Sequence, residues 1–458
     1  MNDRSYLSRP SRPARTERID DAAHFDRGVL LEKNNDLNGA RSTYQLVVVL
    51  DPGHVEALAS LAWLDAQAGD SRSARTWGEL ALKLDGVNVL ARMALAFAEL
   101  QDKQLEAAGK RLAQLYADPA LTPVNRSIVL GLIGDLNDAQ GDAARAFKAY
   151  DAANAQLKAL YAMFDAPGRE TALGHARRLI DWFEAADAKP WRQPPAARTK
   201  ASDPKAHVFL VGFPRSGTTL LETVLAGHPE VVTLEEKDSL AQAADAYLGS
   251  SQGLERLASI SSGEALRQRD AYWSAVRSFG VEPRGRVFID KMPLATVLLP
   301  IVSQIFPNAR VLFAVRDPRD VVLSCFRRRF GMNAATYELL TLDGAATYYD
   351  AVMTLADVYR HMLPIPQHLV RYESLVEDFE GTVRSACDFL DLEWNSNMAD
   401  VAATARSRGI STPSAAQLAG GLNREGQGAW RRYREQMTPV LPVLEPWVKR
   451  FGYEASDQ

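Results

Sequence analysis

The sequence has few cysteines, no long apolar run and little net charge. Its two cysteines, Cys325 and Cys387, have neither the spacing of a metal site nor the dense pattern of a disulfide framework. No run of 18 apolar residues is present, which excludes a transmembrane helix. A formal net charge of -4 gives no reason to expect nucleic acid as a partner. We therefore expect a cytoplasmic protein with no metal and no membrane span.

A length of 458 residues predicts two to three domains. Residues 1–20 are rich in Arg, Ser and Pro but lack the apolar centre of a secretory signal, so we expect a disordered tail there. An organelle-transit segment is the alternative.

A repeat with a fixed period follows this tail. Leu50-Asp51-Pro52 recurs as Leu84-Asp85-Gly86, and 85 − 51 = 34. Ala40, Ala74 and Ala108 have the same spacing. Thirty-four residues is the period of tetratricopeptide repeats, in which helix pairs stack and small residues allow close packing. A helical domain without repeats is the alternative.

The repeat pattern defines the expected domain organisation. We assign residues 21–184 to a tetratricopeptide-like domain, with three to four helix pairs up to about residue 162. Such an array has a concave surface for a peptide, a partner helix or self-association. Residues 185–206 form a linker or boundary strap, because Lys189-Pro-Trp-Arg-Gln-Pro-Pro breaks the helical pattern. Residues 207–458 form the second folded domain.

The second domain opens with a candidate anion site. Val208 to Val211 is a short apolar run typical of a buried strand, Gly212 to Gly217 is a tight loop, and helical spacing begins at Thr218. Backbone N–H groups and the helix dipole favour anions at such a helix start. An ordinary tight turn is the alternative.

The loop lacks the lysine of a nucleotide-binding P-loop. The spacing Gly212-x4-Gly217 matches G-x-x-x-x-G-K-[ST], but Thr218 occupies the position of the lysine that reaches the β- and γ-phosphates. This argues against ATP or GTP as a phosphoryl donor. Arg215 adds a planar donor suited to an anion with several oxygens.

The segment Phe209-Leu-Val-Gly-Phe-Pro-Arg-Ser-Gly-Thr-Thr219 resembles the 5′-phosphosulfate loop of sulfotransferases that use 3′-phosphoadenosine 5′-phosphosulfate (PAPS). It is most similar to tyrosylprotein sulfotransferases and to bacterial sulfotransferases with tetratricopeptide repeats, over about Lys205 to Trp430. The resemblance implies a P-loop-like α/β sulfotransferase domain with a mostly parallel central sheet, PAPS as donor and adenosine 3′,5′-bisphosphate as product. The loop residues that it implies for donor binding are Arg215, Ser216, Gly217, Thr218 and Thr219.

Two further segments carry candidate catalytic groups. A strand at Val231 to Leu234 delivers Glu235 and Glu236 to its carboxyl end, where a carboxylate can take the acceptor proton. The resemblance implies that Glu236 is the base, with Glu235 as the fallback and a solvated acidic turn as the alternative. It also matches Lys291, at the end of the next strand, to a family lysine that can stabilise the leaving oxygen.

For Lys291, the alternative is an edge lysine paired with Asp290. We expect Lys291→Ala or Arg215→Ala to slow turnover by on the order of 10²–10³ with little loss of folding.

The resemblance also implies a 3′-phosphate site. Arg316 ends a predicted strand and Ser324 follows on the next helix, where the family binds that phosphate. Arg328 aligns with another cofactor-contacting arginine, and Tyr372 with a tyrosine that contacts the nucleotide. For Tyr372 the alternative is a half-buried core tyrosine, and for Arg316 and Ser324 a strand-end salt bridge and a surface serine.

The C-terminal part of the donor site departs from the family pattern. Its segment over the adenosine and 3′-phosphate matches this sequence at Ser414, Gln417, Asn423 and Trp430. The family lysine before the tryptophan is Ala429 here. Either Arg424 or Arg431 can supply the missing charge, and the sequence does not decide between them.

The expected activity is sulfuryl transfer from PAPS to a hydroxyl acceptor, and the resemblance favours a protein or peptide tyrosine. The alternatives are a sulfotransferase for a carbohydrate or small metabolite, a nucleotide kinase, and a repeat-based scaffold with an inactive nucleotide-binding domain. We expect a protein partner or self-association at the repeats. The oligomeric state stays open.

Overall fold

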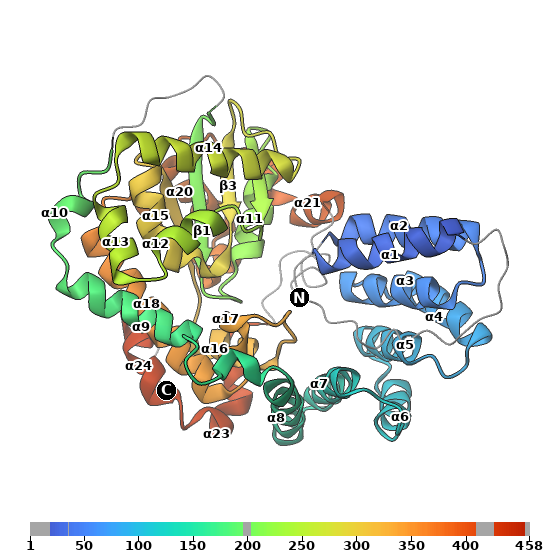
Figure 1. The fold of residues 1–458 in the computed structure, drawn as a ribbon. Helices are drawn as coiled ribbons and strands as arrows, with labels where there is room; N and C mark the ends of the chain where they lie inside the picture. Colours follow the sequence, from blue (N-terminus) through green and yellow to red (C-terminus); the bar gives the residue numbers. More distant parts are fainter. Residues whose placement is uncertain (1–18, 35, 196–202, 409–425, 454–458) are drawn as a thin grey trace.

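An all-helical region precedes a domain built on a parallel sheet (Figure 1). The computed structural model describes residues 19–34, 36–195, 203–408 and 426–453. Within those residues, no helix combines the length and the apolar character needed to cross a membrane. A helical region followed by a domain with a parallel sheet is the architecture that the sequence predicts.

The helical region starts with four consecutive helix pairs. The paired helices are α1 (Ile19–Lys33) and α2 (Leu37–Leu50), α3 (Val55–Ala68) and α4 (Ser71–Leu84), α5 (Val89–Gln101) and α6 (Leu105–Tyr116), and α7 (Pro123–Ala139) and α8 (Ala143–Leu160). The alanines expected at close helix contacts, Ala40, Ala74 and Ala108, are fully buried on the second helix of the first three pairs. The period of 34 residues therefore corresponds to one helix pair.

The spacing between matching alanines is longer in the fourth pair. The buried alanine that matches Ala108 in its place on the second helix is Ala146, and 146 − 108 = 38 rather than 34. Helix α7 has 17 residues where α5 has 13, and these four extra residues account for the shift. Aspartates cap three of the second helices: the side chains of Asp36, Asp70 and Asp142 each accept a backbone N–H from the first turn.

The sheet has five strands in the order β2-β3-β1-β4-β5, and all four pairings are parallel. The strands are β1 (Ala206–Gly212), β2 (Val231–Glu235), β3 (Val287–Lys291), β4 (Arg310–Val315) and β5 (Gln367–Arg371). The central strand β1 pairs with β3 on one side and β4 on the other, so Leu210 lies opposite both Lys291 and Leu312. Ligands of such sheets bind at the carboxyl ends of the strands.

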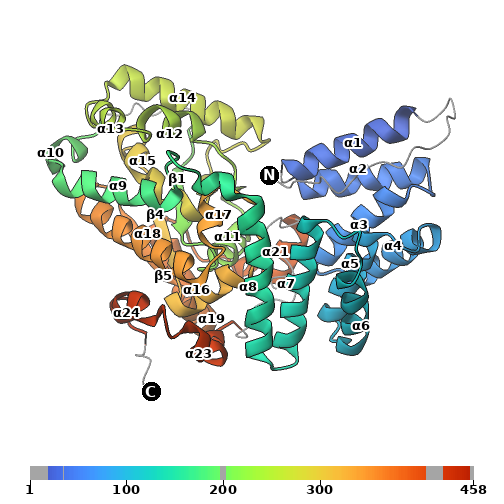
Figure 2. The same ribbon diagram turned by 60° about the horizontal axis from the view of Figure 1, so that its bottom comes forward.

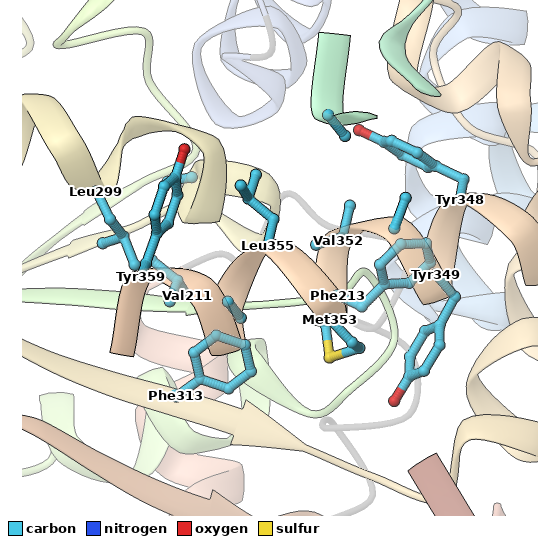
Figure 3. Packing of buried hydrophobic residues seen from close by; sticks show 14 of the residues in the cluster. Val211, Phe213, Leu299, Phe313, Tyr348, Tyr349, Val352, Met353, Leu355 and Tyr359 are labelled. Atoms are coloured by element: carbon cyan, nitrogen blue, oxygen red, sulfur yellow. The ribbon is translucent and has the colours of Figure 1, made fainter. Parts of the chain in front are cut away.

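Helices cover both faces of the sheet. One face packs against α14 (Ser262–Ser278), α15 (Leu299–Ile305), α16 (Pro318–Arg327) and α18 (Leu342–Met362), and the other against α11 (Thr218–Ala226), α20 (Phe379–Phe389) and α21 (Val401–Arg408). Figure 3 shows Val352 and Leu355 of α18 packed near Val211 and Phe313 of the sheet.

The other helical elements that the structure describes are η1 (Ala162–Asp165), α9 (Ala172–Ala185), α10 (Ala188–Trp191), α12 (Ala241–Tyr247), α13 (Ser251–Ala258), η2 (Pro293–Leu298), α17 (Ala334–Glu338), α19 (Tyr372–Glu377), η3 (Ser396–Ala399), η4 (Ala429–Tyr433), α23 (Arg434–Met437) and α24 (Leu441–Arg450).

The hydrophobic core of the sheet domain includes helix α9 and part of the segment predicted as a linker or strap. Helix α9 lies along α18 of the sheet domain (Figure 2). Trp191 in that segment is 1% exposed, and its ring packs against Phe183 at 4.8 Å between centroids. Gln304 of α15 donates a hydrogen bond to the carbonyl of Trp191. Residues 186–191 therefore act as a strap that packs on the sheet domain.

The helical region contacts the sheet domain at both of its ends. Helix α8 lies beside α16, which follows β4 (Figure 2). At the other end of the array, Lys237 Nζ donates to the carbonyl of Asn34 over 3.3 Å, next to the end of β2. The helix pairs therefore form an arc that begins and ends on the sheet domain.

Candidate active site at the carboxyl edge of the sheet

The loop after β1 requires glycine at two positions. Gly217 has φ 94°, and a Cβ there would lie 2.8 Å from Cδ2 of Tyr372. A Cβ on Gly212 would lie 2.5 Å from the carbonyl oxygen of Ala314 on the neighbouring strand. Arg215 also has a positive φ of 70°, which is uncommon for a residue with a side chain. The loop is therefore held in one tight conformation.

The polar residues of this loop surround the start of α11. Ser216, Thr218 and Thr219 are 2%, 3% and 7% exposed. Helix α11 begins at Thr218, directly after Gly217. Its N-terminal N–H groups and dipole give this end of the helix an affinity for anions.

Three arginines gather around the loop. Arg215 Nε donates a hydrogen bond to Ser324 Oγ over 3.1 Å, and Arg316 Nη1 donates to the carbonyl of Arg215 over 3.3 Å. Burial, together with the nearby charges of Arg328 and Arg316, lowers the pKa of Arg215 to about 9. Three guanidinium groups that repel each other favour a bound polyanion.

The structure brings together two residues that the sequence analysis assigned to different ends of the donor. Arg215 was assigned to the 5′-phosphosulfate end of the donor and Ser324 to the 3′-phosphate end, yet their side chains touch. The contact arises because β1 and β4 are neighbours, so the segments that follow them start side by side. Residues predicted for the two subsites are therefore in direct contact.

Tyr372 lies at the rim of the arginine cluster. It is half-buried at the start of α19, and the guanidinium of Arg316 lies 4.7 Å from its ring centroid. Burial raises the pKa of Tyr372. The ring also packs beside the core cluster that includes Val370 and Leu375. It thus contacts both the core and the candidate site.

Lys291 is the centre of a buried charge cluster. Its side chain is 0% exposed, and Nζ lies 2.7 Å from Glu236, 3.2 Å from Glu235 and 3.4 Å from Glu222. Burial by itself lowers the pKa of Lys291, but these three carboxylates outweigh burial and raise it. The partner suggested by the sequence, Asp290, does not form this ion pair.

Asp290 belongs to a separate hydrogen-bond network. It accepts hydrogen bonds from Ser239 Oγ at 2.7 Å and Tyr272 OH at 2.8 Å, and His207 Nε2 lies 2.8 Å from the same phenol oxygen. Burial raises the pKa of Asp290 to about 6. Since Ser239 follows Glu236 by three residues, this network holds the segment that carries Glu236.

Glu222 and the Asp290 network were missed in the sequence. Glu222 is 1% exposed on α11, among Leu221, Val224 and Leu225. A single acidic residue in this apolar helix was the available signal, because a buried carboxylate needs a partner.

Glu236 is held at the end of β2 in a conformation that is rare for a residue with a side chain. Its φ is 49°, and its N–H donates to the carbonyl of Lys291 over 2.8 Å. Its side chain is 32% exposed, whereas that of Glu235 is 18% exposed. Of the three carboxylates around Lys291, Glu236 is therefore the most accessible to an acceptor.

The C-terminal segment covers the start of α16. The carbonyl of Gly426 accepts a hydrogen bond from Arg316, and Asp320 accepts the backbone N–H groups of Gly428 and Trp430. Trp430 is 3% exposed, and the guanidinium of Arg319 lies 4.3 Å from its ring centroid. Three other residues predicted for this part of the site lie outside the described residues: Ser414, Gln417 and Asn423.

Arg424, one of the two arginines considered as a substitute for the family lysine, also lies outside the described residues. The other, Arg431, has its guanidinium 5.7 Å from the ring centroid of Trp430.

Arg328, also predicted to contact the donor, directly follows the last residue of α16. Its side chain is half-buried, and burial lowers its pKa.

Comparison with known proteins gives matches that include the sheet domain. Residues 207–396 match the model of the Sulfotransferase family. An uncharacterized protein of Aquifex aeolicus is 23% identical over 92% of this chain and 54% of its own length. A protein-tyrosine sulfotransferase of Drosophila melanogaster is 30% identical over 41% of this chain and 38% of its own length. The chain thus spans about half, or less, of these relatives.

A solved sulfotransferase domain from the Synechococcus olefin synthase is 20% identical, covers 58% of this chain and 100% of its own, and superposes with a TM-score of 0.33. The family match begins at the first strand and includes the loop after β1, Glu236, Lys291, Arg316 and Arg328. Residues 207–396 of this chain are thus similar to the sulfotransferase family.

Proposed function

We propose that this protein transfers a sulfuryl group from PAPS to a hydroxyl acceptor and releases adenosine 3′,5′-bisphosphate. The observation that carries the proposal is the contact between Arg215 and Ser324. It brings Arg215 of the loop and Ser324 of α16 together at the carboxyl edge of the sheet, beside the start of α11. A donor with phosphates at both ends of its ribose needs hydrogen-bond donors from both elements, since each phosphate binds a separate set of donors.

PAPS supplies an activated sulfuryl group, whose bond from sulfur to the bridging phosphate oxygen breaks during transfer. Glu236 takes the proton of the acceptor hydroxyl as its oxygen bonds to sulfur. The ammonium of Lys291 and the guanidinium of Arg215 stabilise the negative charge that develops on the leaving oxygen. Because Glu236 becomes neutral when it takes the proton, the charge of Lys291 is then less neutralised by its neighbours.

The acceptor that we favour is a tyrosine of a protein or peptide. One support is that the Drosophila relative is named a protein-tyrosine sulfotransferase. The other is the helical region, whose period of 34 residues matches that of tetratricopeptide repeats. Repeat arrays of that kind bind polypeptides on their concave surface. We also propose a cytoplasmic location, with which the two free, buried cysteines agree.

Binding and transfer assays test the donor and acceptor separately. Calorimetry should detect binding of adenosine 3′,5′-bisphosphate and much weaker binding of ATP, and the reverse order would favour a nucleotide kinase. Transfer from 35S-labelled PAPS should then label tyrosine-containing peptides. Label on carbohydrates or small phenols alone would refute the tyrosine acceptor, and no transfer to any hydroxyl would favour an inactive scaffold.

A further inference from the structure

Three consecutive arginines, Arg327 to Arg329, lie at the end of α16 and directly after it, and the helical region holds two of them. Arg327 Nη2 lies 2.5 Å from Oδ2 of Asp138, and Arg329 Nη2 lies 2.9 Å from Oδ2 of Asp135. Both aspartates belong to α7, the first helix of the fourth pair. The side chain that lies between these two anchors in the sequence is Arg328.

Asp138 has further partners in the C-terminal segment. Its Oδ1 accepts a hydrogen bond from Tyr433 OH at 2.7 Å and lies 3.2 Å from Nη1 of Arg432. The guanidinium of Arg327 stands 5.2 Å from the ring centroids of both Tyr150 and Tyr433, so two aromatic rings flank it. One carboxylate of α7 therefore links α16 to η4.

These two elements carry the candidate donor site. Helix α16 carries Ser324 and is followed by Arg328, and η4 continues the segment whose Gly426 carbonyl accepts from Arg316. Packing between α8 and α16 supports the same connection: Phe147 stacks on Phe326 at 4.9 Å, and Asn154 donates to the carbonyl of Phe326.

Arg328 differs from its two neighbours. Among the residues that the structure describes, its side chain forms no hydrogen bond and no ion pair. Its charge nevertheless acts on Arg215, whose pKa it helps to lower. Arg328 is thus the one of the three whose charge is left to the candidate donor site, whereas Arg327 and Arg329 are bound to carboxylates.

We propose that Asp138 of the helical region is a positioning residue for the donor site: it fixes Arg327 and Tyr433, and thereby holds Arg328 and the C-terminal segment where the donor binds. This inference rests on the proposed donor chemistry. It makes the fourth helix pair a part of the donor site, in addition to any role of the repeats in acceptor binding. Without the carboxylate, Arg327 stays half-buried beside Arg328, and mutual repulsion displaces both.

Full-length Asp138→Asn tests the inference by calorimetry with adenosine 3′,5′-bisphosphate. We expect its affinity to fall by about tenfold or more, the size typical of coupling between sites. The KM for PAPS should rise while the KM for the acceptor stays within about twofold. Asp151→Asn, an exposed change on the adjacent helix α8, is the matched control and should bind as the unmodified protein does.

Two more variants separate positioning from simple loss of folding. Tyr433→Phe keeps the ion pair between Asp138 and Arg327 but removes one hydrogen bond, so a smaller loss of about threefold is expected. Asp138→Glu restores the charge and should recover part of the affinity lost in Asp138→Asn. Equal affinity of Asp138→Asn, Tyr433→Phe and the unmodified protein would overturn the positioning role. If the unmodified protein does not bind the bisphosphate, the proposed function fails first.

Discussion

The hydrogen bond from Arg215 Nε to Ser324 Oγ joins the loop after β1 to the helix after β4. These residues are 109 positions apart in the sequence, yet their strands are hydrogen-bonded neighbours in the sheet. A ligand that binds the loop is therefore also within reach of α16. This relationship brings two local sequence motifs into direct contact.

Replacing Arg215 with alanine should slow turnover by on the order of 10²–10³, because the loop then loses a charged donor aimed at the leaving group. Folding should change little, since removal of this arginine relieves repulsion from Arg316 and Arg328. Initial rates with saturating acceptor measure the effect. Arg145→Ala is the control, because that side chain is 80% exposed on α8 and should leave the rate unchanged. A rate within about threefold for Arg215→Ala would contradict its role.

Replacing Lys291 with alanine should reduce both activity and stability. The sequence led us to expect little loss of folding, but the side chain is 0% exposed and compensates Glu222, Glu235 and Glu236. Removing one partner of such a buried cluster costs about 3–5 kcal/mol of the free energy of unfolding. Urea denaturation measures this cost.

The matched control for Lys291→Ala is Lys205→Ala. Lys205 pairs with Glu230 at the surface, and its side chain is 46% exposed. Exposed pairs contribute about 0–1 kcal/mol. If both variants lose the same small amount of stability, the buried cluster is not the structural element that its geometry indicates.

Much of the site could be predicted from local patterns, and the remainder depends on contacts over long sequence distances. A strand, a glycine-bounded loop and a helix start are adjacent in the chain, so the region around Arg215 was recognisable. The spacing of 34 residues likewise predicted the helix pairs. Glu222, by contrast, reaches Lys291 across 291 − 222 = 69 positions, and Asp138 reaches Arg327 across 189. No periodicity encodes such contacts, because they depend on how elements pack.

The loop glycine Gly217 offers a test of donor binding that leaves every charge in place. Gly217→Ala introduces a methyl group 2.8 Å from the ring of Tyr372 at a φ of 94°. We expect the affinity for adenosine 3′,5′-bisphosphate to fall by at least about tenfold, because the loop must shift from the start of α11. Calorimetry measures it.

Gly280→Ala is the control for backbone strain alone, since Gly280 has φ 79° with no atom within 4 Å of its Cβ position. Both variants should lose about 1–2 kcal/mol of stability from the left-handed conformation. Gly280→Ala should bind the bisphosphate normally. Normal binding by both variants would show that the loop conformation is not needed for the donor.

Asp290 predicts a dependence of stability on pH. Burial raises its folded-state pKa from 3.8 to about 6, so the folded protein holds this proton more tightly than the unfolded chain does. The contribution of Asp290 to the free energy of unfolding is therefore fully present below about pH 4 and is lost as the pH rises towards 6. A difference of about two pKa units corresponds to roughly 3 kcal/mol. Asp290→Asn keeps an acceptor for Ser239 and Tyr272 but cannot ionise.

The Tm of Asp290→Asn relative to the unmodified protein should consequently rise between pH 4 and 6.5 and stay constant above that. Asp320, whose pKa burial also raises to about 6, titrates in both proteins and cancels in the difference. Thermal unfolding of the two proteins at matched ionic strength measures this difference. A Tm difference that is independent of pH would mean that Asp290 ionises in the folded protein as it does in the unfolded chain, and that its network with Tyr272 and Ser239 is not buried as described.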